Sequence, residues 1–234
     1  MVVIIKGQNV NEVFVKVSKA LLSEGHRNDP RGLLTMELCD AWLIIEDVSN
    51  PVVSLPERDI NIRYLMGEME WYNSGSLLAK DIHKYSKFWT TLADSNGTIN
   101  SNYGFLALIE KWSGKSQVEW CINSLKKDKH TRQAVINYNQ PRHKYEGVKD
   151  FVCTLTQQFV VRNGKLDMVV LMRSNDLIFG LTYDIPWFVS VLRTVSEATG
   201  IPMGTYNHYA SSLHVYEKHF KMVEAMANAH TSIE

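Results

Sequence analysis

The spacing of apolar and polar positions divides the chain into helical and extended segments. Apolar residues recur every three or four positions over residues 11–23, which predicts a helix that ends at Gly25. Helical spacing also predicts helices over residues 59–71, 87–92, 103–112, 116–127, 184–199 and 213–227. Apolar runs and two-residue alternation predict strands over residues 33–47, 134–139, 151–162, 165–173 and 205–210.

The order of these segments favours an α+β fold. Helices and strands are mixed, and the later strands follow one another, with Asn163-Gly164 predicting a tight hairpin turn. We therefore expect a mixed, mostly antiparallel sheet with surrounding helices. No linker divides the 234 residues, so we expect one catalytic domain over residues 1–234.

Composition narrows the class of protein. Lys and Arg number 25, as do Asp and Glu, and this zero net charge argues against a protein that coats nucleic acid. No apolar run is long enough to span a membrane, and no basic signal-peptide start precedes Lys6. The three widely spaced cysteines predict a reducing cytoplasm rather than a disulfide framework. No HExxH or CxxC motif is present, so no metal is expected.

One group of reactive side chains stands out around Cys153. A lone cysteine in a strand-like run is usually a small buried hydrophobe. This chain also supplies Arg31, Arg132 and Arg173, however, and arginine forks are common ligands of phosphate dianions. A thiol beside cations has a lowered pKa and becomes a nucleophile. The combination suggests covalent catalysis on a phosphorylated small molecule.

Ordered sequence motifs give this suggestion a family context. From Glu68 to Phe220 the chain resembles the thymidylate synthase family, in family order and at family-like intervals. The resemblance implies a thymidylate synthase-like fold whose sheet packs at a homodimer interface. The first 60 residues match less well, although Arg31 falls where the family places a phosphate-binding arginine. The matching pieces are GEMEW, INSNYG, TRQAVINYN, DFVCTLTQQF, GKL, MRSNDLIFG and SLHVYEKH.

Several details resemble the phage branch of the family that hydroxymethylates deoxycytidylate. Thr154 stands where synthases commonly carry His, and Met172 replaces their Gln. The sequence ends at HTSIE, without the apolar tail that closes over the folate in synthases. The resemblance implies dCMP, 5,10-methylenetetrahydrofolate and water as substrates, with no metal. It also implies a phage enzyme of DNA modification in the host cytoplasm, without membrane or direct nucleic-acid contact.

Asp184 carries the expected choice of base. The family's synthases have Asn at this position, whose amide donates to uracil O4 and accepts from N3–H. A carboxylate only accepts, which suits the amino group of cytosine and its N3 once protonated. Judged from the residues alone, Asp184 is equally explained as the N-cap of a helix before Ile185-Pro186.

The resemblance implies roles for the other site residues. The Cys153 thiolate adds to C6 of the pyrimidine, with Tyr103 beside it, and Glu68 relays protons. Arg132 comes from the other subunit of an obligate homodimer; Gln133 replaces the family's second arginine, for which Arg142 is the alternative. The 5′-phosphate is held by Arg31, Arg132, Arg173 and Ser174, the ribose by His214 and Tyr216, and the folate by Glu68, Asp176 and Trp89.

Two other readings stay open. The first is a dUMP hydroxymethylase or a thymidylate synthase on the same fold, with Asp184 as the discriminating residue. The second is a non-catalytic nucleotide-binding relative, against which the presence of Cys153, Arg173 and Glu68 argues. Taken singly, Trp89 is more often a core residue, and Arg132 is an ordinary solvated charge beside Lys129 and His130.

Overall fold

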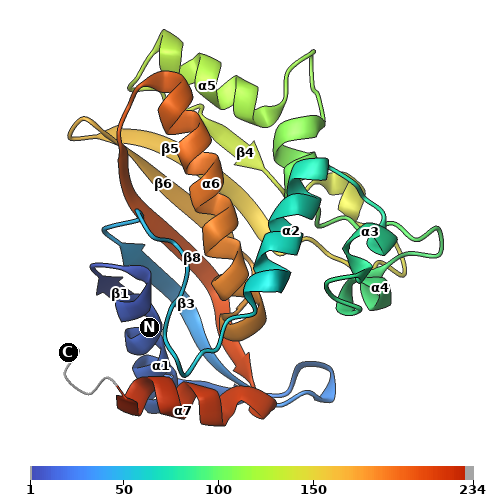
Figure 1. Ribbon diagram of the computed structural model, residues 1–234, viewed down its shortest axis with the longest axis vertical. Helices are drawn as coiled ribbons and strands as arrows, with labels where there is room; N and C mark the ends of the chain where they lie inside the picture. Colours follow the sequence, from blue (N-terminus) through green and yellow to red (C-terminus); the bar gives the residue numbers. More distant parts are fainter. Residues whose placement is uncertain (1, 230–234) are drawn as a thin grey trace. The chain divides into compact units, whose positions relative to one another are not determined.

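The computed structural model describes residues 2–229, so the HTSIE end lies outside the described residues. The chain forms two compact units (Figure 1). Unit 1 comprises Met1–Ile60 and Val161–Glu234, and unit 2 comprises Asn61–Val160. Within the described part of the chain, no helix combines the length and apolarity that a membrane span requires.

Unit 1 is built on a mixed sheet around one long strand. Strand β8 (Met203–Tyr216) pairs antiparallel with β3 (Thr35–Ile45) and parallel with β6 (Lys165–Met172). Strand β1 (Val3–Gly7) continues the sheet parallel to β3. Short β2 (His26–Asn28) pairs antiparallel with β3. The sheet is therefore not a simple meander, because strands far apart in the sequence lie side by side.

Helices cover this sheet through their apolar faces. Helix α1 (Val10–Glu24) is capped by the Asn9 side chain, which accepts from the Glu12 amide at 3.1 Å. It lies beside α7 (Phe220–Ala229), while α6 (Thr182–Thr199) lies across β6 and β8 (Figure 1). The connecting turns are η1 (Pro30–Gly32), η5 (Glu217–His219) and the π-helical η4 (Leu177–Leu181), which follows the two-residue strand β7 (Asn175–Asp176).

Unit 2 is mainly helical, with one pair of strands. Its β4 (Val135–Asn137) pairs antiparallel with β5 (Thr154–Arg162), which continues along the chain into unit 1. Helix α5 begins with a reciprocal capping box between Ser116 and Glu119. The other elements are α2 (Ile62–Ser74), α3 (Ala79–His83), α4 (Phe88–Leu92), η2 (Phe105–Ile109), α5 (Gln117–Lys127) and η3 (Pro141–His143).

The α+β class is confirmed, but several predicted boundaries are wrong. Residues 213–216 are not the start of the last helix, because β8 extends to Tyr216 and alternates buried with half-buried side chains. The helix predicted over 103–112 is only the π-helical turn η2. Strand β5 begins at Thr154, so Cys153 lies just before the strand. Strands β1 and β2 and helix α3 were not predicted.

A buried histidine lies in the middle of the unit 1 sheet. On β8, His208 has no exposed surface and faces Leu43 of β3 and Val170 of β6 in the strand register. Its Nδ1 shares a 2.7 Å hydrogen bond with the Tyr206 hydroxyl, and its buried Nε2 has no partner among the described residues. Burial lowers the pKa of His208 from 6.5 to about 3.

This histidine makes the protein sensitive to mild acid. Between pH 6.5 and 3 the unfolded chain binds a proton at His208 and the folded protein does not. The free energy of unfolding therefore decreases as the pH falls. We expect His208→Gln to flatten this slope by about 1.4 kcal/mol per pH unit below pH 6.5, measured by urea unfolding at pH 8 and pH 5. Exposed His26→Gln is the control; equal slopes in wild type and His208→Gln would contradict the assignment.

Candidate functional site

The expected site residues fall into two sets, one in each unit. Unit 2 holds Glu68, Trp89, Tyr103, Arg132 and Cys153. The other expected site residues belong to unit 1, and the two sets are treated one after the other. The unit 1 residues are Arg31, Arg173, Ser174, Asp176, Asp184, His214 and Tyr216.

Cys153 lies at the point where an irregular segment enters β5. It is half-buried and in no disulfide, with its Sγ 3.9 Å from the Phe151 carbonyl oxygen. The adjacent backbone is held on both sides, because Asn139 Nδ2 donates to the Val152 carbonyl at 2.8 Å and the Tyr138 amide donates to Leu155. The half-buried thiol is therefore accessible, and the backbone that carries it is held in one position. Buried Cys121 differs, because burial raises its pKa to about 12.

Asp150 ties the segment before Cys153 to a second loop. The buried carboxylate accepts from both the amide and the hydroxyl of Ser101, at 2.7 Å and 2.6 Å. Asn100 Nδ2 donates to the Asp150 carbonyl oxygen at 2.9 Å. Burial raises the pKa of Asp150, and the bonds from Ser101 oppose that shift. The loop that precedes Tyr103 is thereby joined to the chain that leads to the thiol.

Tyr103 is packed between two other tyrosine rings. It stacks on Tyr72 at a centroid distance of 5.3 Å and meets Tyr138 edge-on at 5.1 Å. The following Gly104 permits this packing, since a Cβ there would lie 1.7 Å from the Tyr72 carbonyl oxygen. The Tyr103 ring is therefore held in place by two neighbouring rings.

A hydrogen-bonded chain connects Glu68 with Trp89. The Tyr64 hydroxyl, one helical turn before Glu68, donates to its Oε1 at 2.5 Å. Trp89 Nε1 donates to the same hydroxyl at 3.1 Å, and its ring lies 5.1 Å from that of Trp71. Tyr64 was missed by the sequence analysis, although its spacing of four from Glu68 on a helix was the available signal. The buried carboxylate of Glu68 is thus held by a neutral donor.

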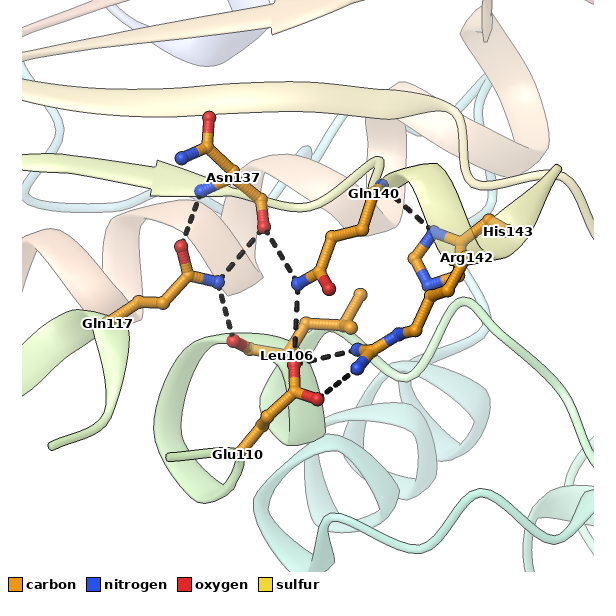
Figure 2. A network of polar contacts seen from close by, with 7 residues as sticks. All are labelled: Leu106, Glu110, Gln117, Asn137, Gln140, Arg142 and His143. Carbon is orange, nitrogen blue, oxygen red and sulfur yellow. Dashed lines mark hydrogen bonds and ion pairs between the residues drawn. The ribbon is translucent and has the colours of Figure 1, made fainter. Parts of the chain in front are cut away.

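A polar network joins η2, β4 and η3 beside this set (Figure 2). Gln117 Nε2 donates to the carbonyl oxygens of Leu106 and Asn137, at 2.8 Å and 2.9 Å, and its Oε1 accepts from the Asn137 amide. Arg142 forms a two-pronged ion pair with Glu110, with Nη2–Oε2 at 2.7 Å. Burial raises the pKa of Glu110, but the hydrogen bond and charge of Arg142 outweigh burial, so the pKa is lowered overall. The Arg142 guanidinium is occupied by this ion pair.

The arginines differ in exposure. Arg132 is exposed on the segment before β4, and its carbonyl oxygen accepts from Gln158 Nε2 at 3.1 Å. Arg31 is exposed within η1 and has a left-handed backbone with φ of 59°, which costs a non-glycine residue about 1 kcal/mol. Arg173 and Ser174 are half-buried where β6 ends.

The end of β8 presents His214 and Tyr216 on the same face of the strand. Their rings meet edge-on at 5.4 Å, and β7 places Asp176 beside His214 in the register. Asp176 Oδ1 accepts from the amides of Ile178 and Phe179, at 2.6 Å and 2.9 Å. Its buried Oδ2 has no hydrogen-bond partner among the described residues. That acceptor fits the N–H groups of a pterin, the co-substrate group that the resemblance implies.

Asp184 is buried in the first turn of α6. The N-cap residue is Leu181, without a side-chain bond, and Asp184 is the third residue of the helix; its interpretation as an N-cap is therefore wrong. Asn175 Nδ2 donates to its Oδ2 at 2.7 Å. Burial raises the pKa of Asp184 to about 6, with Asn175 lowering it and the charge of Asp176 raising it. Asn175 was missed by the sequence analysis, although it lies within the MRSND motif.

Taken by itself, unit 2 supplies a positioned thiol and a buried carboxylate with a hydroxyl partner, groups that suit nucleophilic and proton-transfer chemistry. Unit 1, taken by itself, supplies two buried carboxylate acceptors together with Arg31 and Arg173, groups that suit a hydrogen-bonding, anionic ligand. Within residues 2–229, no three His, Cys, Asp or Glu side chains are grouped so as to hold a metal ion.

Comparison with known proteins agrees with this chemistry. The family described as Thymidylate synthase matches residues 12–232. The proteins named deoxycytidylate 5-hydroxymethyltransferase from Enterobacteria phages T4 and T6 are 32% and 33% identical over 227 residues, covering 92% of this chain and 89% of theirs. Deoxyuridylate hydroxymethyltransferase of Bacillus phage SP01 is 27% identical over 223 residues, 90% of this chain and 58% of that protein.

A solved structure shows the same fold. Thermostable thymidylate synthase A from Bacillus subtilis superposes with a TM-score of 0.76 at 20% identity, covering 94% of this chain and 84% of that one. The match confirms the expected fold class.

The Asp150–Ser101 junction gives a test of how the thiol segment is held. We expect Asp150→Ala to lower the free energy of unfolding by about 1–3 kcal/mol, because the buried Ser101 amide loses its acceptor. Ser101→Ala should add less in the Asp150→Ala background than alone, by about 1 kcal/mol in urea unfolding. Asp128→Ala, which removes an exposed carboxylate bonded to the His130 amide, is the control. Strict additivity would contradict the junction.

Proposed function

Because the chain belongs to the thymidylate synthase family, whose members transfer folate-bound one-carbon units to pyrimidine nucleotides, we propose that it hydroxymethylates deoxycytidylate. The proposed reaction converts dCMP, 5,10-methylenetetrahydrofolate and water to 5-hydroxymethyl-dCMP and tetrahydrofolate. Residues 1–234 form the single catalytic domain in this proposal. The enzyme is encoded by a phage and acts in the cytoplasm of the host cell. The relatives that carry this activity in their names support the proposal.

The buried carboxylate of Asp184 is the observation that carries the choice of cytosine. It is a hydrogen-bond acceptor when ionised, and a pKa of about 6 leaves it ionised at neutral pH. The amino group of cytosine donates to such an acceptor, whereas the O4 atom of uracil is repelled by it. A polar group left unpaired in this position disfavours the wrong base by roughly 1–3 kcal/mol or more.

Cys153 is the proposed nucleophile. Its thiolate adds to C6 of the pyrimidine, which places negative charge on the base and makes C5 nucleophilic. C5 bonds to the methylene carbon of the folate co-substrate, and loss of the C5 proton and of tetrahydrofolate, as the bond from that carbon to the folate nitrogen breaks, leaves an exocyclic methylene on the base. Water adds to this methylene with loss of a proton, and the Cys153 thiolate leaves from C6. Glu68, held by the Tyr64 hydroxyl, accepts and returns protons around the base and orders the attacking water. Tyr103 keeps the neighbourhood of the thiol packed and fixed.

The remaining residues bind the substrates in this proposal. Trp89 covers the folate, and the free Oδ2 of Asp176 accepts from the pterin. His214 and Tyr216 bind the ribose 3′-hydroxyl. The phosphate is held by Arg31, Arg173 and Ser174 of one subunit. Arg132 of the partner subunit in a homodimer completes this phosphate site.

A competition assay tests the proposal directly. Purified protein is mixed with equal dCMP and dUMP plus 5,10-methylenetetrahydrofolate, and the products are read by mass spectrometry. We expect a dCMP product heavier by CH2O, and we expect Cys153→Ser to lower turnover by at least about 10³-fold because the covalent step is lost. Cys39→Ser, at an exposed thiol elsewhere, is the control.

Each other outcome identifies a different enzyme. A CH2O gain on dUMP would match the activity named for the SP01 relative and would reverse the base assignment. A CH2 gain on dUMP would mean a thymidylate synthase. No product from either nucleotide would favour a non-catalytic binding protein, and full turnover by Cys153→Ser would contradict the covalent mechanism.

Subunit mixing tests the homodimer and the role of Arg132. Arg132→Ala and Cys153→Ala are each expected to be inactive. When the two are mixed and allowed to exchange subunits, about a quarter of wild-type activity should return, because half of the dimers are mixed and each mixed dimer has one intact site. Mixing Cys153→Ala with Arg173→Ala is the control, since both residues belong to the same subunit's site. An absence of recovery in the first mixture would place Arg132 in its own subunit's site.

A further inference from the structure

Asn175 carries a polar side chain at a buried position where an apolar side chain would pack as well. Only 3% of its surface is exposed, and its Nδ2 donates to Asp184 Oδ2 at 2.7 Å. Its Oδ1 is also buried and has no hydrogen-bond partner among the described residues. An unpaired buried acceptor destabilises a fold, and an apolar side chain would avoid that loss. The amide is therefore explained by what its donor does for Asp184.

The surrounding backbone is shaped to admit this pair. A Cβ on Gly180 would lie 2.6 Å from Asn175 Nδ2 and 3.3 Å from Asp184 Oδ2. Gly180 belongs to η4, a π-helical turn between β7 and α6, and such turns are frequent at functional sites. Three successive elements thus place an amide, a glycine and a carboxylate together.

We propose that Asn175 is a positioning residue that fixes which hydrogen-bonding atom of residue 184 faces the pyrimidine. Base selectivity is then a property of the Asn175–Asp184 pair rather than of Asp184 alone. This inference rests on the proposed function and identifies a residue that sets its specificity.

The argument follows from the symmetry of the two side chains. A carboxylate presents an oxygen whichever way it turns, so Asn175 mainly keeps Asp184 ionised and in one plane. An amide at position 184 has two different ends. The Asn175 donor would hold its oxygen, which leaves its NH2 group to face the base. An asparagine at this position therefore presents a donor only while Asn175 is present.

The test is a cycle of variants assayed for kcat/KM on dCMP and dUMP. Asp184→Asn should lower the ratio of dCMP to dUMP activity by 10²-fold or more, because a donor now faces uracil O4. Asn175→Ala in that background frees the amide to turn, so the ratio should return toward one by at least about tenfold. Asn175→Ala alone should retain the preference for dCMP, with kcat/KM lower by about tenfold.

A pH profile distinguishes positioning from mere support of the fold. The groups that act on the Asp184 carboxylate are the Asn175 side chain, by its hydrogen bond, and Asp176, by its charge. Loss of the Asn175 donor should move the acid limb of kcat/KM for dCMP upward by about one pH unit, toward neutral pH. Gly180→Ala, which pushes on the amide without removing a hydrogen-bonding group, should shift the limb in the same direction.

Controls keep the inference open to contradiction. Thr194→Ala, on the exposed side of the same helix, removes one hydrogen bond and should leave the ratio and the acid limb unchanged. If Asn175→Ala fails to fold, as judged by thermal unfolding, Asn175→Ser replaces it in the cycle. Equal ratios for Asp184→Asn with and without Asn175, or an unmoved acid limb, would overturn the inference.

Failure of the proposed function remains separable from failure of this inference. If the wild-type protein converts neither nucleotide, the proposed function is wrong, and the cycle is read from calorimetric binding of dCMP and dUMP. A change in the binding ratio between Asp184→Asn and the double variant would still support Asn175 as the positioning residue. An unchanged binding ratio would overturn it.

Discussion

The pairing of β3 with β8 is the interaction on which unit 1 depends. The ladder runs from Thr35 opposite Tyr216 to Ile45 opposite Tyr206, and β8 also pairs with β6 and β7 along its other edge. Because this register sets which face each β8 side chain occupies, a slip by one position would turn His214 and Tyr216 to the other face. The same ladder fixes His208 in the interior. The candidate ribose and pterin contacts are thus set by backbone hydrogen bonds rather than by loop conformation.

Buried carboxylates near the candidate chemistry are held by neutral donors. Tyr64 donates to Glu68, Ser101 donates to Asp150, and Asn175 donates to Asp184. At Asp150 and Asp184 burial raises the pKa of the carboxyl group, and the hydrogen bond from the neutral donor lowers it only in part while it orients the oxygen. Glu110 shows the alternative, because burial raises its pKa but the Arg142 guanidinium and other hydrogen-bond donors lower it overall. Orientation without neutralisation suits groups that must exchange protons or accept from a substrate.

Sequence patterns were sufficient for the elements with strong periodicity, whereas the roles assigned to residues within the motifs stay predictions. Helices α1, α5 and α6 and strands β5 and β6 lie close to their predicted bounds, and the turn at Asn163-Gly164 has positive φ at both residues. The end of β8 was misassigned because Leu213, Tyr216 and Phe220 have the i, i+3, i+7 spacing of a helix stripe, while Leu213 and Val215 also suit a strand face, and only pairing with β3 decides. Tyr64 and Asn175 were missed because their roles arise from hydrogen bonds within the fold. No property of the isolated residue types indicates those bonds.

The absence of a side chain at Gly180 has an evolutionary consequence. Codons for aspartate and asparagine differ at one nucleotide, so position 184 can change its hydrogen-bonding character in a single mutational step. Under the proposed role of Asn175, this step would yield a defined new preference only in a chain with room for the Asn175 amide, which Gly180 provides. A larger residue at position 180 would push on that amide and remove this route. The glycine would then preserve access to either pyrimidine by a single substitution at position 184.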